Sequence, residues 1–167
     1  VQTCALPIWK TGWVLGCPEI VSAVTTAKQF LSYVGVTHVQ PAVARGLDEC
    51  GEWVDAMAAE LASNRDLLVS GLRELGLEVH GAEGGYFVVA DVSSLGLGNA
   101  IETCRALPEK VGVAAIPVPA FVDDPEDPRW RDLVRFGFCK RREVLEEGIR
   151  RIRDYLARGD GTAESGE

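Results

Sequence analysis

The sequence lacks the features of a nucleic-acid-binding, membrane-embedded or zinc-binding protein. Its net charge is -8, whereas binding to phosphate backbones or anionic membranes needs clustered Lys and Arg. No apolar run is long enough to cross a bilayer, and no charged segment followed by an apolar one indicates a secretion signal. The five cysteines include no Cys-x-x-Cys pair and no His at ligand spacing, which favours scattered thiols in a reducing compartment over a disulfide framework or a metal site. We therefore expect a cytoplasmic protein with neither a nucleic-acid nor a membrane partner.

The first eight residues show no helical or strand period, and we expect residues 1–8 to be foreign to the fold. Read back into codons, they resemble a translated sequencing-adapter oligonucleotide. The alternative is an ordinary N-terminal coil. A segment of foreign origin takes no part in the fold, so we expect the native chain to begin near Trp9.

Hydrophobic periodicity predicts an α+β fold in which helices pack on one face of a small sheet. The strongest pattern is an apolar stripe over residues 52–75, with Gly76 placed to end the helix. A helix of this length exceeds the radius of a small domain, so we expect it to run from one domain into the next. The other predicted helices cover residues 18–33, 39–47, 99–107 and 140–158, and the predicted strands cover residues 9–15, 77–80, 86–91, 112–117 and 133–140. A glycine-rich hairpin turn is predicted at residues 81–85, an exposed loop at 122–131 and a disordered tail at 159–167.

Arg135 is the candidate functional residue that the residue pattern itself indicates. It lies in a short apolar strand, flanked by Val134 and Phe136, where a buried charge is costly unless it meets an anion. The planar guanidinium can bind a carboxylate through two parallel hydrogen bonds. An arginine on an edge strand that points into solvent is the alternative, and the spacing alone does not decide between them.

Four ordered motifs resemble those of the class I/II aminotransferases, enzymes of fold type I that use pyridoxal 5'-phosphate (PLP). The motifs are Trp-Lys-Thr-Gly-Trp from Trp9, Glu-Gly-Gly-Tyr-Phe from Glu83, Gly-Val-Ala-Ala-Ile-Pro from Gly112 and Val-Arg-Phe-Gly-Phe-Cys-Lys from Val134. The branch with kynurenine, glutamine and methionine aminotransferases is the most similar. The resemblance implies an α/β (α+β) chain composed of a remnant of the large PLP-binding domain at residues 9–47 and a C-terminal small domain at residues 48–158, which includes the long interdomain helix.

The resemblance also implies roles for three residues. Lys10 matches the basic residue that holds the cofactor phosphate, and Arg135 matches the arginine that binds the substrate α-carboxylate. Tyr33 lies near a position where relatives place an aromatic ring across the dimer interface into the neighbouring pocket, although a buried tyrosine at a helix end is an equal alternative. The lysine that holds the cofactor as a Schiff base should precede Lys10 by eight positions, where this chain has Gln2. No catalytic residue is therefore assigned.

The resemblance implies transfer of an amino group between an L-amino acid and a 2-oxo acid, in a full-length homodimer. Because the Schiff-base lysine is missing, we expect this chain to be a C-terminal fragment that is inactive alone. Two alternatives stay open: a PLP-dependent carbon-sulfur β-lyase on the same scaffold, and a non-catalytic α+β binding or dimerisation module.

Overall fold

The computed structural model describes residues 2–6, 11–35 and 37–159, and it divides the chain into two compact units, Val1–Asp55 and Ala56–Glu167. The units are described separately below. The observed division lies inside the long helix, later in the chain than the boundary that we expected between residues 47 and 48. None of the helices in the described ranges is long and apolar enough to span a membrane.

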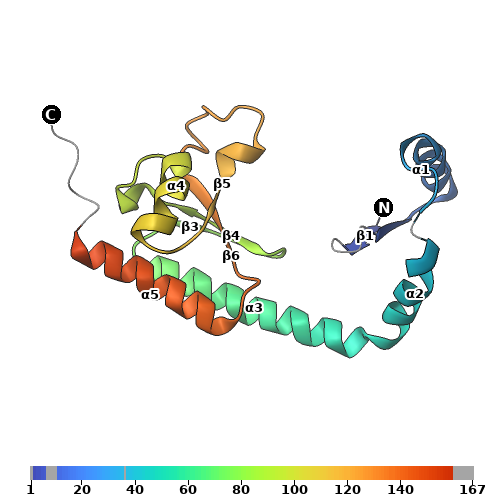
Figure 1. Cartoon of the computed structure of the whole chain (residues 1–167), viewed down its shortest axis with the longest axis horizontal. Helices are drawn as coiled ribbons and strands as arrows, with labels where there is room; N and C mark the ends of the chain where they lie inside the picture. Colours follow the sequence, from blue (N-terminus) through green and yellow to red (C-terminus); the bar gives the residue numbers. More distant parts are fainter. Residues whose placement is uncertain (1, 7–10, 36, 160–167) are drawn as a thin grey trace. The chain divides into compact units, whose positions relative to one another are not determined.

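The first unit starts with a β-hairpin and continues with helices (Figure 1). Strand β1 (Gln2–Leu6) pairs antiparallel with β2 (Thr11–Leu15), with Cys4 opposite Trp13. The alternative of an N-terminal coil is wrong, because Gln2–Leu6 form a paired strand. Such pairing runs through the backbone and needs no particular side-chain period, so the foreign origin of residues 1–8 stays a prediction. Helices α1 (Pro18–Leu31), η2 (Thr37–Val39) and α2 (Gln40–Glu49) follow.

Helix α1 begins as predicted and ends earlier than predicted. Pro18 occupies the first turn, where its missing N–H costs no hydrogen bond, and Glu19 lies at the same positive end. The helix ends at Leu31 instead of Tyr33, because the N–H groups of Ser32 and Tyr33 both donate to the carbonyl of Lys28. Tyr33 then has a left-handed backbone, with φ of 56°.

The second unit contains a four-stranded sheet and three long helices (Figure 1). Its elements are α3 (Gly51–Glu74, which begins in the first unit), β3 (Val79–His80), β4 (Phe87–Asp91), η3 (Ser93–Leu95), α4 (Ala100–Lys110), β5 (Ile116–Pro117), η4 (Val118–Phe121), β6 (Leu133–Gly137) and α5 (Arg142–Arg158). The predicted hairpin turn at residues 81–85 connects β3 and β4, and the predicted loop at residues 122–131 lies between η4 and β6.

The sheet is antiparallel, in the order β3-β4-β6-β5. Strand β6 therefore has a neighbour on both sides, with Arg135 opposite Val89 of β4 and opposite Ile116 of β5. The edge-strand alternative for Arg135 is wrong. Strand β5 is shorter than predicted, because only Ile116 and Pro117 pair with β6.

One hydrophobic core joins the sheet to all three helices of the second unit. Alternate strand residues face it, including Val88 and Ala90 of β4 and Val134 and Phe136 of β6. The helices contribute buried residues to the same cluster: Leu68 and Leu72 of α3, Ala100 and Leu107 of α4, and Leu145, Ile149, Ile152 and Tyr155 of α5. This arrangement agrees with the expectation that the helices cover one face of the sheet.

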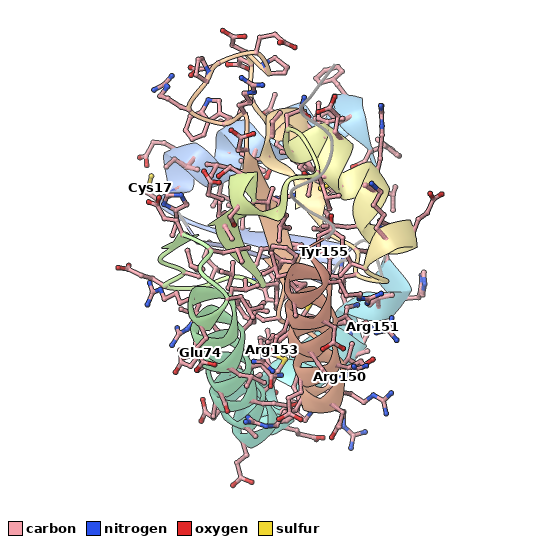
Figure 2. All side chains as sticks on the ribbon, turned by 90° about the vertical axis from the view of Figure 1, so that its left-hand side faces the viewer. Cys17, Glu74, Arg150, Arg151, Arg153 and Tyr155 are labelled. Atoms are coloured by element: carbon pink, nitrogen blue, oxygen red, sulfur yellow. The ribbon has the colours of Figure 1, made fainter. Side chains whose placement is uncertain are left out.

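Helices α3 and α5 lie side by side, as two views show (Figures 1 and 2). Gly71 of α3 packs directly on Ile149 of α5. The Oε2 atom of Glu74 of α3 lies 4.0 Å from the Nη2 atom of Arg153 of α5. The apolar stripe of α3 is buried at Leu68 and Leu72, whereas Trp53 near the start of the helix is 64% exposed. The second unit thus covers only the C-terminal half of the stripe.

Candidate functional site

Arg135 is held at the centre of the sheet by its apolar neighbours in the chain. Val134 is 0% exposed and Phe136 is 4% exposed, so both side chains enter the core. Because successive side chains of a strand point to opposite faces, Arg135 projects from the face that the helices do not cover. The sequence pattern of one cation between apolar residues therefore gives a half-buried guanidinium on the outer face.

Two phenyl rings contact the guanidinium of Arg135. Its Cζ atom lies 3.9 Å from the ring centroid of Phe121 and 4.8 Å from that of Phe87. Phe87 belongs to β4 and Phe121 ends η4, which follows β5, so the rings come from the segments on either side of β6. A cation over an aromatic face is attracted by the ring quadrupole, by about 0.5–1 kcal/mol at exposed sites and more when desolvated.

The Arg135 guanidinium has no anionic partner among the residues that the structure describes. Its Nε atom is buried and donates no hydrogen bond. Other arginines in this part of the chain do have carboxylate partners; examples are Arg65 with Asp66, Arg129 with Asp127 and Arg142 with Glu146. A buried donor without an acceptor is costly, and an added carboxylate would relieve that cost through the in-plane N–H groups.

A cavity of about 770 Å³ borders Arg135. Its walls come mainly from β6, from residues 112–116 and from residues 143–152 of α5, with Phe87 of β4 and Leu68 of α3, and they are mainly apolar. The charged residues that line it, besides Arg135, are Lys140, Glu143, Glu147 and Arg151. Its size suits a small organic ligand. No group of three or more His, Cys, Asp or Glu side chains in the described ranges could hold a metal ion.

Asn64 fixes the chain where it leaves β6. Its side chain is 3% exposed, and its Nδ2 atom donates a hydrogen bond of 2.9 Å to the carbonyl of Lys140. This bond joins α3 to the segment between β6 and α5. Because a buried amide needs a partner, the bond satisfies Asn64 and at the same time anchors the C-terminal end of the cavity wall.

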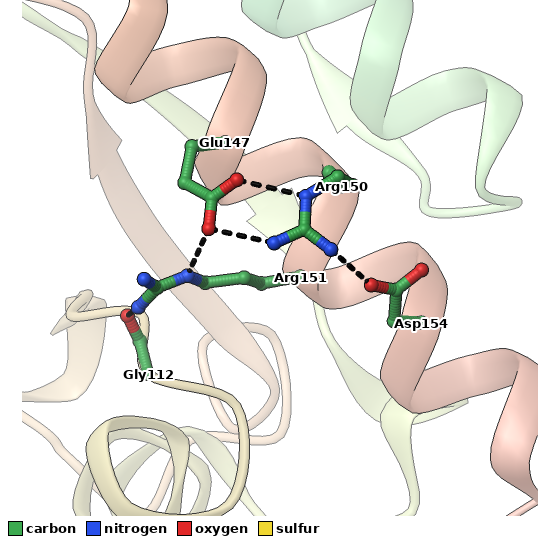
Figure 3. A network of polar contacts seen from close by, with 5 residues as sticks. All are labelled: Gly112, Glu147, Arg150, Arg151 and Asp154. Atoms are coloured by element: carbon green, nitrogen blue, oxygen red, sulfur yellow. Dashed lines mark hydrogen bonds and ion pairs between the residues drawn. The ribbon is translucent and has the colours of Figure 1, made fainter.

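A polar network anchors another part of the same wall (Figure 3). Arg151 donates from Nε to Glu147 at 2.7 Å and from Nη1 to the carbonyl of Gly112 at 2.9 Å. Arg150 also donates to Glu147 and pairs with Asp154. Hydrogen bonds from Arg150 and Arg151 lower the pKa of Glu147 to about 2. The network thus ties residues 112–116, which end in β5, to α5.

The other two predicted site residues lie in the first unit. Lys10, the predicted phosphate-binding residue, lies outside the described residues. Tyr33 is 78% exposed at the end of α1, so the alternative of a buried tyrosine at a helix end is wrong for this chain. Its carbonyl accepts a hydrogen bond of 3.3 Å from Lys28 Nζ. The structure does not bring Tyr33 and Arg135 together within one unit.

Sequence reasoning missed Phe87, Phe121 and Asn64. Phe87 lies in a predicted strand, but its approach to Arg135 depends on the register between β4 and β6. Phe121 and Asn64 make contacts across 14 and 76 positions of the sequence. Local periodicity carries no signal for such contacts.

The chain is similar to several aminotransferases of known sequence. It is 49% identical over 150 residues to a probable N-succinyldiaminopimelate aminotransferase, DapC, of Mycobacterium tuberculosis, a match that covers 86% of this chain and 38% of the relative. It is 32% identical to the methionine aminotransferase of Escherichia coli, and this match covers 87% of this chain and 37% of the relative. The kynurenine–oxoglutarate transaminase 3 of Mus musculus is 31% identical, and this match covers 87% of this chain and 35% of the relative. The chain thus spans less than two fifths of the length of these relatives.

Solved structures and a family model give the same result. The structure of N-succinyldiaminopimelate aminotransferase from M. tuberculosis matches with a TM-score of 0.79 and 49% identity, over 89% of this chain and 38% of that one. This match confirms the expected mixed α and β fold of fold type I aminotransferases. Because the family model for aminotransferase class I and II matches residues 3–152, as the four motifs indicated, the chain belongs to that family.

Proposed function

We propose that this chain contributes the site that binds the substrate carboxylate in a PLP-dependent aminotransferase, and that Arg135 is the residue that binds this carboxylate. The observation that carries the proposal is the half-buried guanidinium with an unpartnered Nε atom and two aromatic contacts. A bidentate hydrogen bond from arginine fixes both the position and the plane of a carboxylate. Amino acids and 2-oxo acids, the proposed substrates, share that group.

Tyr33 and Lys10 complete the proposed set of site residues. The exposed ring of Tyr33 is available to reach a neighbouring subunit, and we propose the full-length protein to be a homodimer. Free thiols at Cys17, Cys50 and Cys139 that lie exposed suit a reducing, cytoplasmic compartment. The relatives named above act on different amino acids, so the proposal is limited to the carboxylate end of the substrate.

The cofactor places a further demand on the chain. When bound, PLP supplies the electron sink for amino-group transfer, and we propose that Lys10 holds its phosphate. The residue eight positions before Lys10 is Gln2, whose amide cannot form the covalent link. The donor set of this chain therefore fits substrate and phosphate binding and does not fit covalent attachment, and we assign the chain no step of the reaction. We expect no transaminase activity from this chain alone.

Carboxylate binding to the ¹⁵N-labelled 167-residue chain tests the proposal. Titration with pyruvate, a 2-oxo acid, should shift the Nε–H signal of Arg135, which is identified by its absence from the Arg135→Met variant. In that variant the affinity should fall by roughly 10- to 100-fold, as expected for the loss of a charge-assisted hydrogen bond.

Arg129→Met is the matched control. Arg129 also lies over an aromatic ring, that of Trp130 at 5.2 Å, but its guanidinium already pairs with Asp127 at 2.6 Å. Its replacement should leave pyruvate binding unchanged. Equal binding by the wild-type chain and Arg135→Met would remove Arg135 from the site.

A further inference from the structure

The contact between Phe121 and Arg135 is unusual because burial does not explain the position of the ring. Phe121 is 62% exposed, so most of its surface stays accessible to water. It is the last residue of η4, whose Pro119 is buried and whose preceding residue, Pro117, pairs with Val134 of β6. The backbone is therefore anchored beside β6, and the ring centroid lies 3.9 Å from Arg135 Cζ.

An aromatic ring and a carboxylate use different parts of a guanidinium. The ring attracts the cation through its flat face, whereas the N–H groups point outward in the guanidinium plane. A stacked ring thus restricts the rotation of a long side chain and excludes water from one face, and it leaves the in-plane donors free. Arg135 keeps such a donor, because its buried Nε atom makes no hydrogen bond to the described residues.

We propose that Phe121 is a positioning residue that orients the Arg135 guanidinium for its carboxylate. The inference rests on the proposed function, since it assumes that Arg135 binds a carboxylate. The side-chain entropy of arginine is lost before the ligand arrives, so less of the binding free energy is spent on ordering it. Phe87, at 4.8 Å, contacts the same guanidinium from β4 at a greater distance and contributes less.

The test compares Phe121→Leu with Phe121→Trp in the ¹⁵N-labelled 167-residue chain, with pyruvate as the probe. Leu keeps an apolar side chain and removes the ring, whereas Trp keeps an aromatic face. Without ligand, Phe121→Leu should move the Arg135 Nε–H signal, because the ring-current effect of Phe121 is lost. Phe121→Leu should raise the Kd for pyruvate by roughly two- to tenfold, whereas Phe121→Trp should keep a Kd close to that of the wild-type chain.

Phe30→Leu is the matched control: it is the same substitution at another exposed phenylalanine, 85% exposed, in the first unit. It should change neither the Arg135 signal nor the Kd. Thermal unfolding of each variant shows whether a loss of binding reflects a loss of folding, and rescue by Phe121→Trp is the readout that a purely structural role would not give.

Two results overturn the inference, and they are distinguishable. If Phe121→Leu binds pyruvate as tightly as the wild-type chain while Arg135→Met does not bind it, Phe121 does not position Arg135 and the proposed function stands. If the wild-type chain shows no pyruvate-dependent shift of the Arg135 signal, the carboxylate role of Arg135 fails, and the role of Phe121 fails with it.

Discussion

The contact between Gly71 and Ile149 makes the packing of α3 on α5 sensitive to a single methyl group. A Cβ atom added to Gly71 would overlap Cδ1 of Ile149 and would lie 2.9 Å from Cγ1 and 3.0 Å from Cγ2. Ile149 is 6% exposed and β-branched, so its side chain cannot simply rotate away. Gly148, one residue earlier on α5, has nothing within 4 Å of an added Cβ. The same substitution at these two positions therefore separates packing from helix propensity.

The expected effects follow from two opposing contributions. Replacing glycine by alanine inside a helix stabilises it by about 1 kcal/mol, partly through the unfolded state, and this gain applies at both positions. At Gly71 the overlap adds an overpacking cost of about 1–3 kcal/mol. We expect Gly148→Ala to raise the free energy of unfolding by about 1 kcal/mol. The value for Gly71→Ala should be lower than that for Gly148→Ala by about 1–3 kcal/mol.

Urea denaturation followed by circular dichroism measures both variants. In a chain of this size, each kcal/mol corresponds to about 2–4 °C in Tm, so thermal unfolding gives a second measurement. Ile149→Val removes the Cδ1 atom nearest to the added methyl group, so the double variant should be less destabilised than the sum of the single variants. If Gly71→Ala stabilises the chain as much as Gly148→Ala does, α3 and α5 do not pack as described.

Two further expectations concern titrating groups. Hydrogen bonds from Arg150 and Arg151 lower the pKa of Glu147 from its ordinary value of 4.5 to about 2. A carboxyl group with a lowered pKa stabilises the folded state at pH values above its ordinary pKa. This stabilisation is lost as the pH falls from about 4.5 to about 2. The stability of Glu147→Gln, measured by urea denaturation between pH 3 and pH 6, should therefore fall less steeply with acid than that of the wild-type chain, and equal slopes would contradict the network. Partial burial raises the pKa of the Cys104 thiol to about 11, so iodoacetamide at pH 8 should alkylate it more slowly than the exposed Cys17, Cys50 and Cys139. Mass spectrometry of the native chain measures these rates, and urea should abolish the difference; rapid labelling of native Cys104 would show that its thiol is not buried.

Much of the second unit could be predicted from local sequence patterns. The apolar stripe and Gly76 predicted α3, which the structure ends at Glu74. Asn99 predicted the start of α4, and its side chain accepts hydrogen bonds from the N–H groups of Ile101 and Glu102. Arg135 could be selected because a charge between core-facing residues is costly wherever the strand lies. These signals are local, so they do not depend on the tertiary structure.

The features that the sequence did not predict depend on contacts between distant segments. Strand β5 covers only Ile116–Pro117 of the predicted residues 112–117, and Gly112 instead accepts a hydrogen bond from Arg151 of α5. The approach of Phe121 to Arg135 depends on where η4 turns after β5. Strand β1 forms from residues with no apolar alternation, since its partner β2 supplies the backbone hydrogen bonds.

The register of β6 links the stability of the fold to the position of the candidate site. A shift of one residue would turn Arg135 into the core and would move Val134 and Phe136 to the outer face, because side chains alternate along a strand. Burial of each large apolar side chain contributes about 1.5–3 kcal/mol, and an unpaired buried charge costs several kcal/mol more. The core residues therefore exclude the shifted register without any contact to a ligand. The guanidinium is directed to the outer face by its hydrophobic neighbours, and the two rings then determine its orientation on that face.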